Sequence, residues 1–160
     1  MRSWGLAVKP EHKPIFEALT DEQALALTLY LEARSEPTKG IITVGSVILE
    51  RVRLGYFGGK TIKGVCFKPY QFSCYNSKDP QYEKIALRIA SNFDEEAGKI
   101  SKLQECLMIA RGLLSGEIKP NVEAQFYKVV GCPAAWEKEF VHVERIGAHD
   151  FYREPSRKTA

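Results

Sequence analysis

Two glutamates stand close together where a strongly apolar segment of the chain ends. Glu32 and Glu36 are about one helical turn apart, Arg34 lies between them, and Pro37 follows directly. Because proline disfavours helical geometry in the preceding residue, the sequence predicts a helix over 21–35 with Glu32 in its last turn. The negative end of the helix dipole and partial burial would both favour the protonated form of that carboxyl. Such an acid can donate a proton to a glycosidic oxygen, although a solvent-exposed helix end explains the same residues equally well.

A short run near the middle of the chain alternates aromatic with polar side chains. The run YQFSCY ends at Tyr75. In an extended segment successive side chains face opposite sides, so Gln71 and Ser73 would share one face while Phe72 packs beneath them. Sugar-binding grooves combine aromatic rings with amide and hydroxyl groups. We therefore predict that Gln71, Ser73, Tyr75 and Tyr127 line a substrate groove, although aromatic residues more often belong to a core.

A cysteine hydrolase is a second interpretation of the sequence. Its residues would be Cys74 as nucleophile, with His149 and Asp150 as base and orienting group. Thiolates are activated at the first turn of a helix, whereas Cys74 precedes a segment that reads as a loop. The sequence favours structural roles for these residues, and we expect His149 to be a hydrogen-bonded anchor of a sheet.

A metal site is the third interpretation. Its ligands would be His12, His142, His149 and Cys132. These residues lack the short-spaced pair that marks many zinc sites, and the four cysteines form neither a CxxC pair nor a zinc ribbon. We therefore expect no metal and no other cofactor.

Composition places the chain among ordinary single-domain globular proteins. It has 160 residues, 44% hydrophobic residues, a formal net charge of +3 and a pI near 8.6, which is too mild a charge to predict nucleic-acid binding. No segment has the length of a membrane span, and the apolar run at the N-terminus is too short for a secretory signal. We expect a monomeric single domain over 1–160, made in the cytoplasm with reduced thiols. An irregular N-terminal arm over 1–18 and a frayed tail over 154–160 would flank its core.

Hydrophobic periodicity predicts an α+β fold with a helical body followed by a small antiparallel sheet. Small residues at Gly45 and Ser46 would allow the second long helix to approach another helix closely, and Gly55 would end it. The expected helices cover 21–35, 38–54, 61–67, a segment from 80 to about 90, and 94–115. The expected strands cover 124–130, 140–146 and 149–153, with a turn at Gly147 and a further extended segment at 70–75.

Four blocks of the sequence resemble the SleB/CwlJ-type cell wall hydrolases. The run LEARSEP is similar to the E-A-R-G-E-P signature of that family, and GIITVGSVILERVR is similar to its G-x-x-A-V-x-x-V-I-x-N-R-V helix. TIKGVCFKPYQFS resembles the T-I-x-x-V-x-x-P-x-Q-F-S segment, and CPAAW with IGAHDFY resembles the P-x-W and I-G-x-H-x-F-Y elements. The blocks occur in the same order and span about 21–153. Ser35 and Glu50 depart from the glycine and asparagine that are usual at these positions.

The resemblance implies a lysozyme-like or lytic-transglycosylase-like domain that cuts peptidoglycan between N-acetylmuramic acid and N-acetylglucosamine. Carried over by position, Glu32 is the catalytic acid. We also expect Glu36 to bind substrate, and Arg34, Phe72 and His149 to be structural residues near the site. A lytic transglycosylase needs one carboxyl, whereas a muramidase needs two and would have to use Glu36. We expect the transglycosylase route, and a non-catalytic wall-binding module is the alternative from another class. The enzyme would reach the bacterial wall after release, as a phage endolysin or a spore enzyme.

Overall fold

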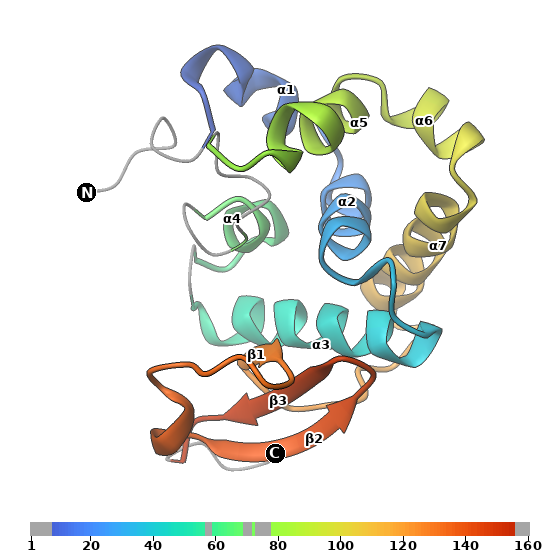
Figure 1. Ribbon diagram of the computed structural model, residues 1–160. Helices are drawn as coiled ribbons and strands as arrows, with labels where there is room; N and C mark the ends of the chain where they lie inside the picture. The colour runs from blue at the N-terminus through green and yellow to red at the C-terminus, as the bar shows by residue number, and fades with distance from the viewer. Residues whose placement is uncertain (1–7, 57–58, 69–71, 73–77, 156–160) are drawn as a thin grey trace.

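Helix α2 (Asp21–Ala33) runs through the middle of the molecule, with helices on several sides of it (Figure 1). The computed structural model describes residues 8–56, 59–68, 72 and 78–155. The six consecutive residues from Ala24 to Leu29 are fully buried, because α3, α4 and α7 all pack against this helix. A helix that is apolar on all sides belongs in a core. Its one hydroxyl group in this stretch, on Thr28, donates to the carbonyl of Ala24 at 2.9 Å.

The predicted start of α2 is confirmed by a capping box. The side chain of Thr20 accepts from the amide of Gln23, and the side chain of Gln23 accepts from the amide of Thr20. The remaining helical elements are η2 (Pro10–His12), α1 (Lys13–Glu17), α3 (Thr38–Leu54), α4 (Ile62–Cys66), the π-helix η4 (Tyr82–Leu87), α5 (Arg88–Ser91), α6 (Phe93–Lys99), α7 (Ser101–Ser115) and η5 (Glu137–Glu139).

Helix α3 approaches its neighbours closely at Gly45, as predicted. A Cβ atom at Gly45 would lie 2.5 Å from Cδ1 of Leu113 in α7 and 3.6 Å from Cδ2 of Leu29 in α2. The helix ends at Gly55, whose φ of 75° is the left-handed conformation that favours glycine. Leucine side chains from two helices therefore occupy the space that the glycine leaves.

The prediction of an irregular arm over 1–18 is wrong for its described part. Residues Lys13–Glu17 form helix α1, and Phe16 is fully buried. The ring of Phe16 packs 5.5 Å from that of Phe67 and 6.2 Å from that of Tyr82, measured between ring centroids. The two prolines of this segment stand in the first turns of two short helices, where proline fits because the amide it lacks has no helical partner.

The single helix predicted over 94–115 is two helices. Phe93–Lys99 and Ser101–Ser115 are separated at Ile100, whose φ of −110° and ψ of 102° are extended rather than helical. The apolar spacing runs through this break without a change of period, so hydrophobic periodicity gave no sign of it.

In the described part of the chain, the sheet has three antiparallel strands in the order β1-β3-β2. They are β1 (Phe126–Val129), β2 (Val141–Ile146) and β3 (His149–Arg153). The turn between β2 and β3 contains Gly147, whose φ is +57°. Figure 1 shows the sheet lying below α3, with α2 and the other long helix, α7, above it. The α+β class predicted from the sequence is thereby confirmed.

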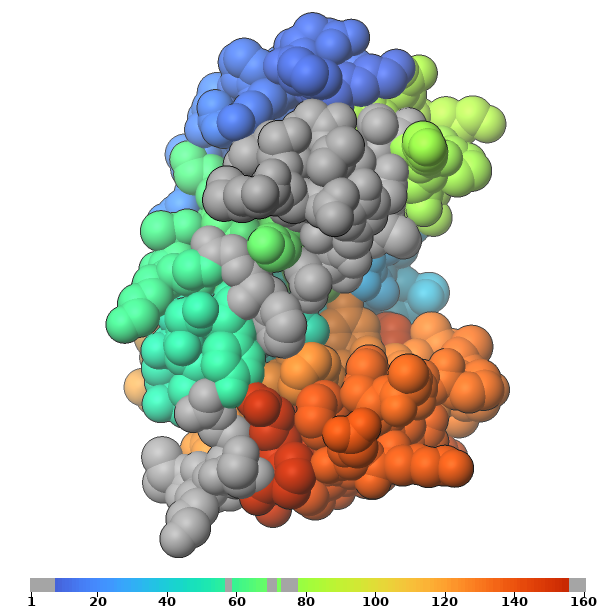
Figure 2. All heavy atoms as spheres, turned by 90° about the vertical axis from the view of Figure 1, so that its left-hand side faces the viewer, coloured from blue at the N-terminus to red at the C-terminus, as the bar shows by residue number. Residues whose placement is uncertain are grey.

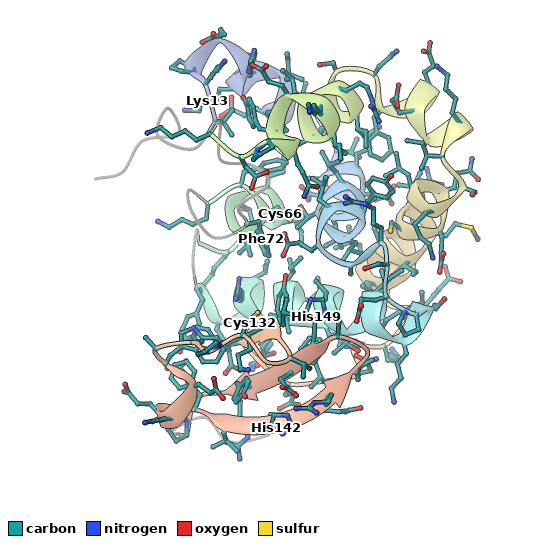
Figure 3. All side chains as sticks on the ribbon, in the orientation of Figure 1. Lys13, Cys66, Phe72, Cys132, His142 and His149 are labelled. Atoms are coloured by element: carbon teal, nitrogen blue, oxygen red, sulfur yellow. The ribbon has the colours of Figure 1, made fainter. Side chains whose placement is uncertain are left out.

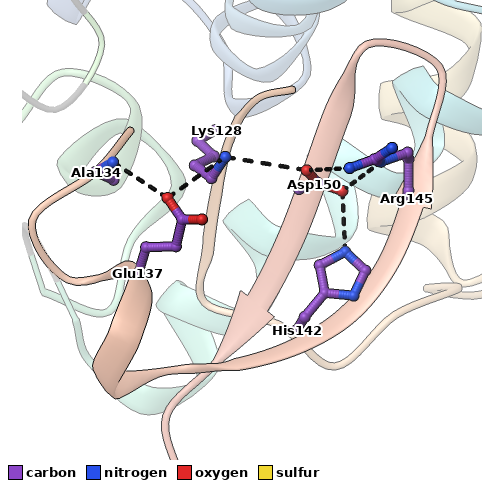
Figure 4. Close-up of polar contacts among 6 residues, drawn as sticks. All are labelled: Lys128, Ala134, Glu137, His142, Arg145 and Asp150. Atoms are coloured by element: carbon purple, nitrogen blue, oxygen red, sulfur yellow. Dashed lines mark hydrogen bonds and ion pairs between the residues drawn. The ribbon is translucent and has the colours of Figure 1, made fainter. Parts of the chain in front are cut away.

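The outer face of the sheet, away from the helices, carries a polar network around Asp150 (Figure 4). Its carboxylate accepts two hydrogen bonds from Arg145, at 2.8 and 3.1 Å, and lies 2.9 Å from Nε2 of His142. These partners, with Arg145 first, lower the pKa of Asp150 to about 2. Lys128 on the neighbouring strand lies 4.0 Å from the same carboxylate.

The predicted frayed tail over 154–160 is anchored at its first residue. The amide of Glu154 donates to Oε1 of Gln125 at 3.0 Å, and its carboxylate accepts from the hydroxyl of Tyr56. Residues 156–160 lie outside the described part. In the part of the chain that the structure describes, no helix is both long and apolar enough to cross a membrane.

Glu36 joins the helical body to the sheet. Its side chain is 6% exposed, and its Oε1 accepts a hydrogen bond from the amide of Ala148 at 2.8 Å. The same oxygen lies 3.5 Å from Nδ1 of His149, which is itself buried. Because the two hydrogen-bonded residues are 112 positions apart, this contact fixes the β2–β3 turn against the α2–α3 connection.

We predict that Gly147→Ala destabilises the protein by more than its backbone conformation alone would cost. A left-handed residue other than glycine costs about 1–2 kcal/mol, and the new Cβ would lie 2.2 Å from Oε1 of Glu36. Gly116→Ala is the matched control, since Gly116 also has positive φ but no neighbour within 4 Å of its added Cβ. Urea unfolding of both variants measures the difference. Equal losses of unfolding free energy would mean that the Glu36 contact tolerates the methyl group.

The buried His149 should make stability depend on pH. Burial lowers the pKa of His149 below its ordinary 6.5, partly offset by the negative charge of Glu36. The unfolded chain therefore takes up this proton more readily, so stability that is present above pH 6.5 is lost as the pH falls through the folded-state pKa. We expect the stability difference between the parent and His149→Gln to be smaller at about pH 5 than at about pH 8.

The same comparison with His142→Gln provides the control for that experiment. His142 is exposed on the outer face of the sheet, so its substitution removes a histidine without touching the buried one. A stability difference for His149→Gln that stays constant with pH would contradict the expected linkage.

Candidate active site

Glu32 and Tyr127 meet where the end of α2 faces the inner side of the sheet. The hydroxyl of Tyr127 donates to Oε1 of Glu32 at 2.6 Å, between residues 95 positions apart. Glu32 is half-buried, in the last turn of α2 as the sequence predicted. The hydrogen bond fixes the orientation of the carboxyl, because it holds one of the two oxygens.

Packing on the inner face of the sheet holds the ring of Tyr127. The ring lies edge-on to that of His149, with 5.1 Å between centroids, and 5.7 Å from that of Phe151. Phe151 is fully buried. Figure 3 shows His149 on the side of the sheet that faces α3, whereas His142 lies on the other side. The Glu32 carboxyl is therefore oriented by a tyrosine whose ring is held by its neighbours on the sheet.

Arg51 is a buried cation beside this pair, and sequence reasoning missed it. It is 6% exposed, and its Nε donates to the carbonyl of Gln125 at 2.8 Å. Burial lowers the pKa of Arg51, and electrostatic interactions with Tyr127 and Glu32 oppose that effect. One signal was available: Arg51 follows Val44 and Ile48 at helical spacing, so it stands on the apolar face of α3.

Arg34 stabilises the end of the helix that carries the acid. Its guanidinium donates to the carbonyls of Tyr30 and Leu31, both at 3.2 Å, and to Oε1 of Gln81 at 3.1 Å. Arginine at a helix C-terminus satisfies carbonyls that lack a helical partner. This geometry agrees with the structural role expected for Arg34.

Glu36, which we expected to bind substrate, is buried against the β2–β3 turn. Its carboxylate is engaged with Ala148 and His149, as described above. Pro37 follows it and begins the turn into α3. The two glutamates of the motif therefore have different surroundings, since Glu32 meets Tyr127 while Glu36 holds the turn between two strands.

The remaining predicted groove residues are only partly described. Gln71, Ser73 and Tyr75 lie outside the described residues, as does Cys74, so their roles stay predictions. Phe72 is buried, and the guanidinium of Arg51 lies 5.7 Å from its ring centroid. Figure 2 views the molecule from the side, with the N-terminal helices at the top and the sheet at the bottom.

A cavity of about 800 Å³ lies elsewhere, beside α3, the segment 119–123 and strands β2 and β3. Neither Glu32 nor Tyr127 lines it. We locate the candidate site by the hydrogen-bonded carboxyl rather than by this cavity, because its lining residues Glu50 and Arg53 already pair with each other at 2.7 Å.

The described residues of the two alternative sites do not come together, and Cys74 lies outside the described part of the chain. His149 faces α3 while Asp150 faces the outer side of the sheet, so the two cannot form a base and its orienting group. Nδ1 of His12 lies 2.7 Å from the hydroxyl of Tyr82 among the helices. His142 lies in the sheet instead, where it contacts Asp150. Cys132 is exposed, in contrast to the buried Cys66, whose pKa is raised to about 12 by burial.

The comparisons with known proteins agree with the resemblance seen in the sequence. A family model described as cell wall hydrolase matches residues 35–152, which begins three positions after Glu32. The catalytic domain of the germination-specific lytic transglycosylase SleB from Bacillus anthracis has a similar fold, with a TM-score of 0.60 and 23% identity. The similarity covers 85% of this chain and 98% of that one. No curated protein sequence matches the chain significantly. Since the family model covers most of the chain, this protein belongs to the SleB/CwlJ-type cell wall hydrolase family, whose members are peptidoglycan-degrading enzymes.

Proposed function

We propose that the protein is a lytic transglycosylase that uses Glu32 as both acid and base. The observation that carries the proposal is the hydrogen bond from Tyr127 to Glu32 at the boundary between the helices and the sheet. The substrate would be the glycan strand of bacterial peptidoglycan, cut at the bond between N-acetylmuramic acid and N-acetylglucosamine. The similar domain from Bacillus anthracis belongs to a lytic transglycosylase, which supports the same reaction class.

The proposed reaction needs one carboxyl in two successive states. Protonated Glu32 gives its proton to the glycosidic oxygen as the bond from that oxygen to the anomeric carbon breaks. The resulting carboxylate then takes the proton of the muramic acid 6-hydroxyl, whose oxygen forms the new bond to the anomeric carbon. The products are a 1,6-anhydro sugar end and a free 4-hydroxyl, and Glu32 is protonated again.

The environment of Glu32 suits both states. Half-burial disfavours the charged carboxylate, whereas the Tyr127 hydroxyl and the charge of Arg51 favour it. The helix end and burial, the two influences evident from the sequence, favour the protonated acid. The hydrogen bond and the buried cation add the opposite influence that a base requires.

A two-carboxylate muramidase is less favoured because of where Glu36 lies. A nucleophile or a base for water must face the sugar on the side opposite the acid. The Glu36 side chain is 6% exposed and accepts from the Ala148 amide, so we propose a structural role for it instead of substrate binding. Gln71, Ser73 and Tyr75 remain our proposed groove residues, with Tyr127 at the acid.

Glu32→Gln should fold normally and lose wall lysis. General acid catalysis contributes about 100- to 10,000-fold to rate, and glutamine is close to isosteric but cannot donate the acid proton. Turbidity clearing of purified cell walls measures the loss, with Glu50→Gln as a control for a glutamate that pairs with Arg53 outside the site. Lysis by folded Glu32→Gln at the parental rate would remove Glu32 from the mechanism. A parent protein that binds walls without cutting them would indicate the binding-module alternative.

The reaction products distinguish the two chemistries. We expect mass spectrometry of digested glycan strands to find 1,6-anhydro-muramic acid ends, which weigh one water less than hydrolysed ends. Glu36→Gln should leave that product unchanged, because the proposed reaction needs no second carboxylate. Reducing ends from the parent protein, with loss of cutting in a folded Glu36→Gln variant, would establish the muramidase route instead.

A further inference from the structure

Arg51 connects three parts of the molecule that converge on the proposed acid. It belongs to α3, it donates from Nε to the carbonyl of Gln125, and its guanidinium lies 5.7 Å from the ring centroid of Phe72. Gln125 directly precedes β1, the strand on which Tyr127 stands. The guanidinium also lies 5.9 Å from the ring centroid of Phe126. Arg51 thus contacts the residues on both sides of the start of β1.

The burial of this cation requires a physical explanation. Removing a charge from water costs several kcal/mol unless hydrogen bonds and opposite charges compensate. Glycine and aliphatic residues occupy most of the other buried positions of α3, so an apolar residue would satisfy packing at this place. Arginine remains charged at every physiological pH, since its ordinary pKa lies above 12. The site therefore contains a permanent positive charge.

Among the residues that the structure describes, acidic groups on three elements act on Arg51. They are Tyr127 on β1, Glu32 on α2 and the Cys66 thiol on α4. Burial disfavours ionisation of Cys66, and a tyrosine is neutral near pH 7. Glu32 is thus the member of this group that can change charge during the proposed reaction.

We propose that Arg51 is a positioning residue for catalysis, which places Tyr127 against Glu32 and stabilises the Glu32 carboxylate after it has given up its proton. This inference rests on the proposed role of Glu32. The hydrogen bond to Gln125 sets the position of β1 and so of the tyrosine hydroxyl. The charge lowers the free energy of the carboxylate when the acid must become a base, in a partly buried site where electrostatic effects are strong.

The rate–pH profile separates this role from a purely structural one. In Arg51→Met the Glu32 carboxylate loses its neighbouring cation, so Glu32 should stay protonated to higher pH. The alkaline limb of the kcat/KM profile should therefore move to higher pH. The maximal rate should fall on the order of 100-fold, as for removal of one preorganised electrostatic group. Arg51→Lys keeps a positive charge, so the alkaline limb of its profile should lie closer to that of the parent. Arg53→Met is the matched control: it removes an exposed arginine from the same helix, and its profile should not change.

A measurement without substrate tests the same inference independently of the proposed function. Carboxyl NMR of labelled glutamate, assigned with Glu32→Gln, gives the titration midpoint of Glu32 in the parent and in each arginine variant. We expect the titration midpoint of Glu32 to rise in Arg51→Met and to stay unchanged in Arg53→Met, whether or not Glu32 proves catalytic. If Arg51→Met does not fold, Arg51→Lys provides the test, since lysine lacks the Nε donor. A Glu32 titration midpoint and a maximal rate equal to those of the parent would then overturn the placement role. An unchanged midpoint in folded Arg51→Met would overturn the electrostatic role.

Discussion

The burial of α2 on all sides constrains everything else in the structure. Helices pack on several of its faces, so the apolar middle of α2 has no contact with water and its charged residues stand at its two ends. The N-terminal end is closed by the capping box at Thr20, and the C-terminal end meets the sheet. A carboxyl in that last turn is held rigidly by the core beneath it. It is also near enough to the surface to receive a substrate, which is the combination that an acid catalyst needs.

Glu32 and Glu36 show how surroundings, rather than residue type, assign roles. The two stand in one short motif, yet one accepts a hydrogen bond from a tyrosine hydroxyl and the other from a backbone amide of the β2–β3 turn. The second contact matters for the first, because it fixes the sheet that carries Tyr127. A structural glutamate and a proposed catalytic glutamate therefore depend on the same docking of sheet against helices.

The sequence predicted the elements well where they depend on interactions between residues close together along the chain. The start of α2 and the end of α3 at Gly55 each depend on a few neighbouring residues, and the small size of Gly45 is evident from the sequence, although the leucines that approach it are not. The break at Ile100 was missed because the apolar spacing continues through it. The packing of Phe16 was missed because proline in a first helical turn resembles proline in a loop.

The candidate site was predictable in part for a similar reason. Glu32 could be identified from a contiguous motif, and the ring and phenol of Tyr127 marked it as a groove residue. The hydrogen bond between them, the buried charge of Arg51 and the engagement of Glu36 with Ala148 are contacts between distant segments. Periodicity and capping rules describe neighbours along the chain, so they contain no information on such pairs.

The 95-residue separation between Glu32 and Tyr127 has a consequence for how the chain acquires its chemistry. Contacts between distant segments close large loops and lose more chain entropy than local ones. A nascent chain that has emerged only through α7 contains the acid but not the strand that orients it. The pair is complete only when β1 has been synthesised and held in place by β3, which follows it along the chain after β2. Cleavage anywhere between residues 33 and 126 likewise leaves two pieces, each with half of the pair.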